Sequence, residues 1–158
     1  MAKKKKHPGE LLVCRNPKAL KTFDIEDKLE AGMVLQGSEV KSLRNRQADL
    51  DGAYASIFNG EAWIEKMHIA PYEQAGPYNN HEPKRKRKLL MKRHEIEKWQ
   101  GKLTTKGYTI VPLQVYFKAG YAKVELGLGK GRKIHDKREE LKRKQDLREA
   151  RDAKQHGR

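Results

Sequence analysis

The sequence alternates apolar and polar residues in two long stretches, and each stretch is interrupted by a short turn signal. The first stretch predicts strands over Ala53–Phe58 and Glu61–Ile69, because apolar residues recur there at about every second position. Between them stands Asn59-Gly60, the dipeptide that most strongly favours a tight type I′ turn. The pattern therefore predicts a β-hairpin in the middle of the chain.

A second hairpin is predicted further along, with strands over Thr109–Lys118 and Tyr121–Leu128 joined by Ala119-Gly120. The apolar residues of its first strand are expected to share one face: Val111, Leu113, Val115 and Phe117. On the return strand the corresponding residues are Val124, Leu126 and Leu128. Pro112 falls on the opposite face, and since proline lacks a backbone donor, it predicts an edge position or a bulge.

Two segments have helical spacing. Gly37–Asn45 is short, with Val40 and Leu43 as its expected buried pair. Leu89–Lys106 is longer, and Gly107 stands where a C-terminal cap is expected. One stripe of this helix is apolar and includes Leu89, Ile96, Trp99 and Leu103.

Earlier strands are predicted over Leu11–Cys14 and Phe23–Leu35, the latter interrupted at Gly32. Short, largely antiparallel strands with few helices favour a small closed barrel over a sandwich or a doubly wound sheet. We therefore predict a mainly β fold with helices, an OB-like antiparallel barrel with two to three helices. The predicted organisation is a basic N-terminal arm over 1–10, an OB-like barrel over 11–128 and a basic tail over 129–158.

Charge narrows the class of partner. The chain of 158 residues has 36 Lys and Arg against 21 Asp and Glu, a net charge of +15, which favours a polyanion. Most of the surplus lies in Lys3–Lys6, Lys84–Arg93 and the tail. No apolar run approaches the length of a membrane span, so nucleic acid is favoured over membrane. The single cysteine, Cys14, permits no internal disulfide and indicates a reducing cytoplasm.

The basic tail has no apolar face of its own, since Ile134 and Leu141 fall together on a helical wheel but Leu147 lies away from them. Such a segment is expected to be disordered when free and helical when bound to RNA, and the alternative is a permanently solvated tail. The long connection between Ala70 and Lys88 has no apolar periodicity. Its Tyr72 and Tyr78 either stack on bases or cap the barrel end.

Catalytic and metal-binding patterns are absent from the sequence. The six histidines lie too far apart for a compact metal motif, and one cysteine cannot form a thiolate cluster. The run GLGKGRK from Gly127 lacks the Ser or Thr of a phosphate-binding loop. The sequence therefore predicts a protein without enzymatic activity, metal or cofactor.

Several ordered blocks carry a more specific signal. They are EAGMVLQGSEVKSLR from Glu30, NGEAWIEKMHIAPYEQ from Asn59, RKLLMKRHEI from Arg87, VPLQVYFKAGYAKVEL from Val111 and GKGRKIHDKR from Gly129. Together they resemble the SsrA-binding protein family (small protein B), which binds transfer-messenger RNA in bacteria. The resemblance covers nearly the whole chain, and the combination of five blocks in order is highly specific.

The resemblance implies an adaptor for trans-translation. The barrel would bind the tRNA-like part of transfer-messenger RNA and support alanyl-tRNA synthetase and elongation factor Tu indirectly, through that RNA. On a stalled ribosome, the tail would enter the empty mRNA channel beside the decoding centre, against small-subunit rRNA. The unfinished peptide is then tagged and the ribosome released. We expect a cytoplasmic monomer that does not bind membranes.

Family motifs carried onto this sequence predict two sets of functional residues. The RNA-binding set is Asn16, Glu30, Gln36, Gly37, Glu39, Lys41, Arg44, Lys88, Leu90, Lys123, Leu128 and Gly129. The decoding-centre set in the tail is Gly131, Lys133, His135, Asp136, Lys137 and Arg138. Without the resemblance, Glu39 would be read as an ordinary exposed helix residue. Leu90 either packs against RNA or closes the barrel.

Some residues depart from the family pattern. Pro17, Leu20, Lys21 and Phe23 replace a stretch that usually carries more Arg and His and a tyrosine, which puts the N-terminal RNA contacts in question. Gly129 stands where alanine is usual and predicts a looser hinge into the tail. Lys92 replaces a polar amide with a charge.

Two other functions remain open on the residues alone. One is a general RNA- or ribosome-binding OB-fold protein whose tail is a nonspecific basic arm. The other is an RNA-processing enzyme, which the missing catalytic constellation disfavours.

Overall fold

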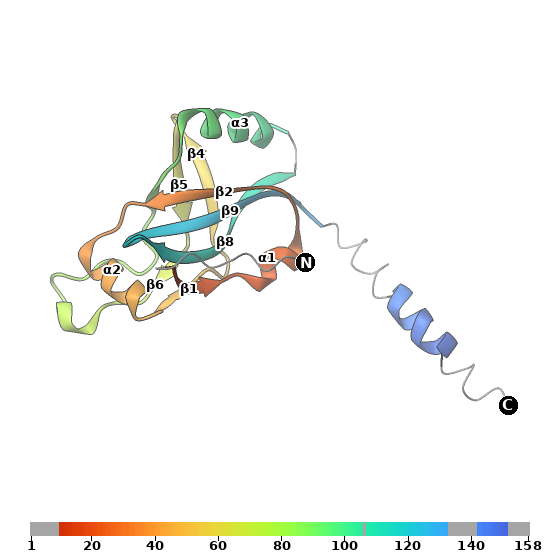
Figure 1. The fold of residues 1–158 in the computed structure, drawn as a ribbon, viewed down its shortest axis with the longest axis horizontal. Helices are drawn as coiled ribbons and strands as arrows, with labels where there is room; N and C mark the ends of the chain where they lie inside the picture. The colour runs from red at the N-terminus through yellow and green to blue at the C-terminus, as the bar shows by residue number, and fades with distance from the viewer. Residues whose placement is uncertain (1–9, 106, 133–141, 152–158) are drawn as a thin grey trace.

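The computed structural model describes residues 10–105, 107–132 and 142–151, and its largest element is an antiparallel sheet that closes on itself (Figure 1). The strand order is β1-β8-β4-β5-β7-β2-β9, and an additional β8–β9 pairing closes the strands from β8 to β9 into a ring, with β1 paired to β8. The strands are β1 (Leu11–Arg15), β2 (Phe23–Met33), β4 (Tyr54–Phe58), β5 (Glu61–Glu65), β7 (Arg87–Leu90), β8 (Tyr108–Lys118) and β9 (Tyr121–Gly131). The closed ring is consistent with the predicted OB-like barrel.

Smaller elements surround this ring. The helices are α1 (Pro17–Thr22), α2 (Gly37–Arg44), α3 (Arg93–Leu103) and the short 3₁₀ helix η1 (Glu73–Ala75). A second sheet pairs β3 (Ala48–Asp49) with β6 (His68–Ile69). In Figure 1, α2 and α3 lie at different ends of the barrel.

Both predicted hairpins are present, and both turns have the geometry that the sequence indicates. Asn59 and Gly60 have φ values of +51° and +72°, and Ala119 and Gly120 have +50° and +81°. Positive φ at both central residues is the requirement of a type I′ turn. The first hairpin is shorter than predicted, because Lys66 turns the chain at a φ of +61° and His68–Ile69 pairs in the second sheet.

The predicted bulge at Pro112 is confirmed, and it changes which residues share a face. The β8–β9 register shifts between Pro112 and Gln114. An extra residue in one strand reverses the side-chain alternation beyond it. Val115 and Phe117 therefore face the main core, whereas Val111 and Leu113 pack with Ala19 of α1 in a separate cluster. The prediction that all four apolar residues share one face is wrong for this reason.

The second predicted helix begins later than its sequence pattern indicates. Leu89 belongs to β7, where it pairs with Met33 on one side and Ala62 on the other. Pairing with two neighbouring strands therefore decides the conformation of Leu89, although its spacing from the later apolar residues fits a helix. The helix α3 runs only from Arg93 to Leu103 and ends at Thr104, so Gly107 is not its cap. Its φ of +93° instead places Gly107 at the turn into β8.

Two boundaries in the long strands also differ from prediction. The strand β2 continues through Gly32, which pairs with Leu90 and Lys123, and its irregularity lies between Ile25 and Asp27. The strand β9 continues to Gly131, past the predicted end of the barrel at residue 128. The barrel therefore extends almost to Arg132, whose backbone N–H donates to the Thr22 carbonyl at 2.8 Å.

The main core fills the ring and is closed at one end by α3. Trp99 of α3 is fully buried, and its indole N–H donates to Asp27 Oδ2 at 2.9 Å. Because this hydrogen bond stabilises the carboxylate, the pKa of Asp27 lies below its ordinary value. The helix is therefore fixed to β2 by apolar packing and by one polar contact.

Residues 142–151 form a helix in which every residue is exposed, including Leu147. This agrees with a basic segment that has helical propensity and no apolar face. The rest of the predicted tail, 133–141 and 152–158, lies outside the described residues, as does the basic arm over 1–9. Within the described ranges, no helix is long and apolar enough to cross a membrane.

Candidate nucleic-acid interface

One face of the barrel gathers several of the predicted RNA-binding residues. Across the ladders, Leu90 pairs with Gly32, Gly32 with Lys123, and Lys123 with Tyr116. Directly paired residues project to the same side of a sheet, and their neighbours Ala31 and Val124 are buried in the core. The aligned residues therefore lie on the outside. We call this surface the outer sheet face, and its residues are Glu30, Gly32, Lys88, Leu90, Tyr116, Lys118 and Lys123.

Leu90 is an exposed apolar residue at one edge of the outer sheet face. Its exposed fraction is 57%, whereas the preceding Leu89 is 2% exposed and fills the core. The alternative that Leu90 closes the barrel is therefore wrong. Its side chain lies over Gly32, where an added Cβ would stand 3.3 Å from the Leu90 Cβ. Gly32 therefore leaves room for the Leu90 side chain, and no side chain projects from the sheet between Leu90 and Lys123.

Glu30 lies one pair further along the same face. The Tyr116 hydroxyl donates a hydrogen bond to Glu30 Oε2, and Lys118 Nζ lies 3.6 Å from the same oxygen. Burial of the ring, followed by the hydrogen bond to this carboxylate, raises the pKa of Tyr116. The tyrosine therefore remains a donor under all ordinary conditions.

The lysines of the face supply positive charge at its surface. Lys88 Nζ forms an ion pair with Glu61 Oε1 at 3.1 Å, with both side chains about half exposed. Such an exposed pair contributes little to stability, so the ammonium group can exchange its partner for a phosphate at small cost. Lys123 lies between Gly32 and Tyr116 and is half-buried.

Helix α2 carries a second group of predicted residues. Gln36, the N-cap, and Gly37 are exposed at its start. Lys41 Nζ lies 5.3 Å from the centre of the Tyr72 ring, and the Arg44 guanidinium lies 5.2 Å from the centre of Phe117. Both cations are exposed and held by aromatic rings, which fixes their positions without neutralising their charge.

Glu39 contradicts both sequence interpretations, because it is buried and its carboxylate faces the protein interior rather than solvent or a bound RNA. It is 0% exposed, and Arg87, also 0% exposed, donates from Nε to Glu39 Oε2. The other oxygen accepts from the Gln36 backbone N–H at 2.9 Å and from Arg85 at 2.7 Å. Burial raises the pKa of Glu39, but the hydrogen bonds from Gln36, Arg85 and Arg87 together outweigh it and hold the pKa below its ordinary value.

The partner of Glu39 was missed at the level of sequence. In the sequence, Arg87 is one more cation of the basic run 84–93, and nothing in that run distinguishes a buried arginine from a solvated one. In the structure its guanidinium also donates to the carbonyls of Met67 at 2.7 Å and Pro83 at 3.1 Å. Arg87 therefore joins β7 to α2 and to both flanks of the long connection.

The long connection is fixed at its base and exposed at its tip. His81 is buried, and its Nε2–H donates to the Ile69 carbonyl at 2.9 Å while Nδ1 lies 2.8 Å from the Ser38 hydroxyl of α2. Asn80 binds both the N–H and the carbonyl of Tyr72. Tyr78 is 96% exposed, so it does not cap the barrel end.

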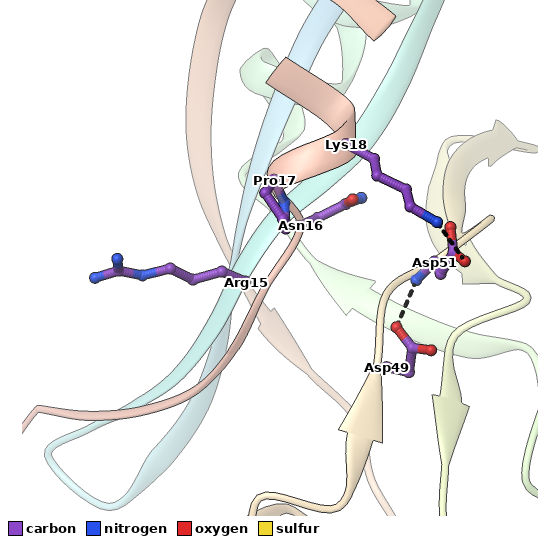
Figure 2. Close-up of a pocket in the computed structure, with 6 residues that line it drawn as sticks. All are labelled: Arg15, Asn16, Pro17, Lys18, Asp49 and Asp51. Carbon is purple, nitrogen blue, oxygen red and sulfur yellow. Dashed lines mark hydrogen bonds and ion pairs between the residues drawn. The ribbon is translucent and has the colours of Figure 1, made fainter. Parts of the chain in front are cut away.

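Asn16 lies at the start of α1, in a pocket with Arg15, Pro17, Lys18, Asp49 and Asp51 (Figure 2). Its Nδ2 donates to the Pro112 carbonyl at 3.0 Å, and its backbone N–H donates to the Leu113 carbonyl at 2.8 Å. Lys18 reaches across the pocket to Asp51 at 3.1 Å. Asn16 therefore anchors α1 to the bulge of β8. Pro17 begins this helix, a position that suits proline, so that departure from the family pattern has a structural role.

Two further predicted residues are inside the protein. Leu128 is 2% exposed within the core, so its side chain does not face a partner. Gly129 lies in β9, and an added Cβ would lie against the Asp24 carbonyl, 2.8 Å from its carbon. The expectation of a looser hinge at Gly129 is therefore wrong, because the residue is held in the sheet. Gly131 is exposed at the strand end.

The remaining tail residues, Lys133, His135, Asp136, Lys137 and Arg138, lie outside the described residues. Among the residues that are described, no three His, Cys, Asp or Glu side chains are arranged to hold a metal ion. Burial raises the pKa of Cys14 to about 11, so its thiol is protonated near neutral pH and is a poor nucleophile.

A closed antiparallel barrel whose outer face combines lysines with exposed apolar and aromatic residues is typical of the small β-barrels that bind RNA. Comparison with known proteins makes this class specific. The model of the SmpB protein family matches residues 13–156, and the chain belongs to that family.

Relatives in other bacteria support the same family. The SsrA-binding protein of Geobacter sulfurreducens is 55% identical over 141 residues, covering 89% of this chain and 92% of the relative. That of Chloroflexus aurantiacus is 50% identical over 148 residues, covering 94% and 91%. A solved chain from the structure described as "tmRNA-SmpB: a journey to the center of the bacterial ribosome" is 47% identical, with a TM-score of 0.65 over 77% of this chain and 85% of that one.

Proposed function

We propose that this protein is an adaptor without enzymatic activity that binds the tRNA-like part of transfer-messenger RNA and delivers it to stalled ribosomes in the bacterial cytoplasm. Its relatives are named SsrA-binding proteins, and a chain of similar fold was solved in a tmRNA–SmpB ribosome study. Alanyl-tRNA synthetase and elongation factor Tu would be partners through the RNA.

The observation that carries the proposal is the row formed by Leu90, Gly32 and Lys123 on the outer sheet face. In this row, Leu90 offers an apolar contact and Lys123 a cation, and Gly32 between them has no side chain to obstruct a bound molecule. A folded RNA offers the matching groups, since bases and riboses are partly apolar and each phosphate is an anion. The exposed side of α2, with Lys41 and Arg44, adds further cations.

The tail has the second task in this proposal. Its predicted motif Asp136-Lys137-Arg138 would contact rRNA at the decoding centre once the mRNA channel is empty, after leaving the barrel at Gly131. The barrel would thus bind one RNA and the tail another, and the two activities should be separable by mutation.

The test is a triple substitution, Asp136→Ala with Lys137→Ala and Arg138→Ala, in the full chain. Transfer-messenger RNA affinity should stay within about 2-fold, while peptide tagging in a reconstituted translation system is lost. The matched control is Asp146→Ala with Arg148→Ala and Arg151→Ala, which removes the same charges from the helix over 142–151. We expect it to reduce tagging far less.

If affinity falls together with tagging in the first variant, barrel and tail do not have separate tasks. A general RNA-binding protein with a nonspecific basic arm predicts a different outcome. It would show no preference for transfer-messenger RNA over bulk tRNA, and both triple variants would behave alike.

A further inference from the structure

Glu30 is held on one side only. Both of its partners, the Tyr116 hydroxyl and Lys118 Nζ, contact the same carboxylate oxygen, Oε2. No partner for Oε1 occurs in the part of the chain that the structure describes. Glu30 is exposed at the surface, so a bound molecule can reach its carboxylate.

The Glu30 carboxylate lies next to a second carboxylate, which is an unfavourable arrangement in a sheet. Glu30 pairs directly with Glu125 across the β2–β9 ladder, and like charges at directly opposed positions repel. Gln114 of β8 donates to Glu125 at 3.3 Å, while Tyr116 and Lys118 of the same strand hold Glu30. The strand β8 therefore keeps the two carboxylates in defined orientations.

A lysine, Lys123, lies next to Glu30 on the outer sheet face. Lys123 is two residues from Glu125 along β9, so it is the diagonal neighbour of Glu30 on the same face. A fixed acceptor next to a lysine matches an RNA strand, in which donor groups lie beside phosphates. A phosphate cannot be the partner of Glu30 itself, since it is an anion that offers only acceptors near neutral pH.

We propose that Tyr116 and Lys118 position Glu30 so that its free oxygen, Oε1, accepts a hydrogen bond from a donor group of the bound RNA. The donor is a ribose 2′-hydroxyl or an exocyclic amino group of a base, donors that remain accessible in the grooves of a base-paired RNA. Tyr116 is a positioning residue in this arrangement, because it acts through Glu30. The inference rests on the proposed function and adds the chemistry that this part of the outer sheet face recognises.

A double-mutant cycle tests the role of Tyr116. The full chain is compared with Tyr116→Phe, Glu30→Gln and the double variant for binding to the tRNA-like domain of transfer-messenger RNA. In Glu30→Gln the single amide oxygen should stay with the donors of Tyr116 and Lys118, so that the amide NH2 faces the RNA donor. Loss of a hydrogen bond to a charged group should then weaken binding about 10-fold. Tyr116→Phe should weaken it by about 3- to 10-fold, and in the Glu30→Gln background it should add nothing. Independent, additive losses would overturn the positioning role.

The same strand supplies a matched control. The Tyr108 hydroxyl donates to both oxygens of Glu26, at 2.8 and 3.0 Å, so it makes the same kind of contact near the other end of β8. Tyr108→Phe should change RNA affinity by less than about 2-fold, because a lost tyrosine–carboxylate bond matters only where the carboxylate meets RNA. An equal loss in both tyrosine variants would mean that each merely stabilises the barrel, and would overturn the proposal.

Interference mapping identifies the donor. Transcripts with scattered 2′-deoxy substitutions, and others with scattered inosine in place of guanosine or purine riboside in place of adenosine, are separated into bound and unbound fractions. Wild-type protein should exclude substitution at a specific position, and this exclusion should vanish with Glu30→Gln and weaken with Tyr116→Phe. A 2′-deoxy signal identifies a ribose, and a base-analogue signal an amino group.

An identical interference pattern for all the proteins would overturn the inference while leaving the proposed function intact. If the wild-type protein does not bind the tRNA-like domain in preference to bulk tRNA, the proposed function itself fails. The two failures are thus distinguishable in one set of measurements.

Discussion

At the scale of single residues, the ion pair between Glu39 and Arg87 determines how α2 meets the barrel. Both side chains are completely buried, and each is bound by further hydrogen bonds that satisfy its charge. A buried pair of this kind contributes little net stability compared with apolar residues of similar size, but removing one partner leaves the other uncompensated. The pair therefore acts mainly on geometry, because it holds Gln36 and the base of the long connection together.

Replacing Glu39 with Gln should lower the free energy of unfolding by about 3–5 kcal/mol, because Arg87 is then buried without a counter-charge. Denaturant unfolding measures this difference. Lys18→Gln is the control, since it breaks an ion pair with Asp51 whose side chains are 73% and 58% exposed. That change should cost less than about 1 kcal/mol. Comparable losses in the two variants would contradict the assigned role.

The same variant should alter the dependence of stability on pH. The pKa of Glu39 lies below its ordinary value of 4.5, so ionised Glu39 contributes its full stabilisation above about that pH. The contribution is lost as the pH falls from there through the lowered folded-state pKa. The wild-type protein should therefore lose more stability than Glu39→Gln on acidification through this range.

At the scale of secondary structure elements, the two long strands β2 and β9 fit together at a close approach that glycine permits. Gly129 faces the backbone of Asp24 and Ile25, beside the irregularity in β2. By contrast, Gly101 lies within α3 with nothing within 4 Å of an added Cβ. The two glycines thus have opposite roles, although the sequence alone does not separate them.

We expect Gly129→Ala to destabilise the protein by about 1–3 kcal/mol, because the strand or its neighbour must shift to admit a methyl group. Gly101→Ala should instead stabilise it by about 0.5–1 kcal/mol, since alanine is the better helix former. Thermal unfolding of the two variants checks both signs. A stable Gly129→Ala protein would mean that the irregularity in β2 moves to accommodate the methyl group.

At the scale of the whole molecule, the core of the barrel is mostly apolar and the positive charge lies on the protein surface. RNA affinity should consequently depend strongly on salt, and about 6–10 phosphate contacts would cost about 10³–10⁵-fold between about 50 and 200 mM. Lys123→Ala should reduce the slope of log affinity against log salt by about 1. Lys102→Ala, on α3 beside Tyr108, is the control and should leave the slope unchanged. Equal slopes for both variants and the wild type would argue against a phosphate contact at Lys123.

The sequence by itself determined the two hairpin turns, the bulge at Pro112 as one of two alternatives, and the family. These features depend on neighbours in the chain: alternation, a turn dipeptide or a proline that cannot donate. Family motifs also predict Glu30, Leu90 and Lys123 as RNA-binding residues, and the structure places the three on one face.

Tertiary structure decided the residues whose role depends on distant partners. Leu89 is a strand residue because it pairs with Met33 and Ala62, and Gly129 lies in close contact with the backbone of Asp24. Glu39 and Arg87 are buried because they meet across 48 residues of sequence. The local sequence pattern cannot predict this contact, since a charged side chain is stable inside a protein only when the fold supplies its counter-charge.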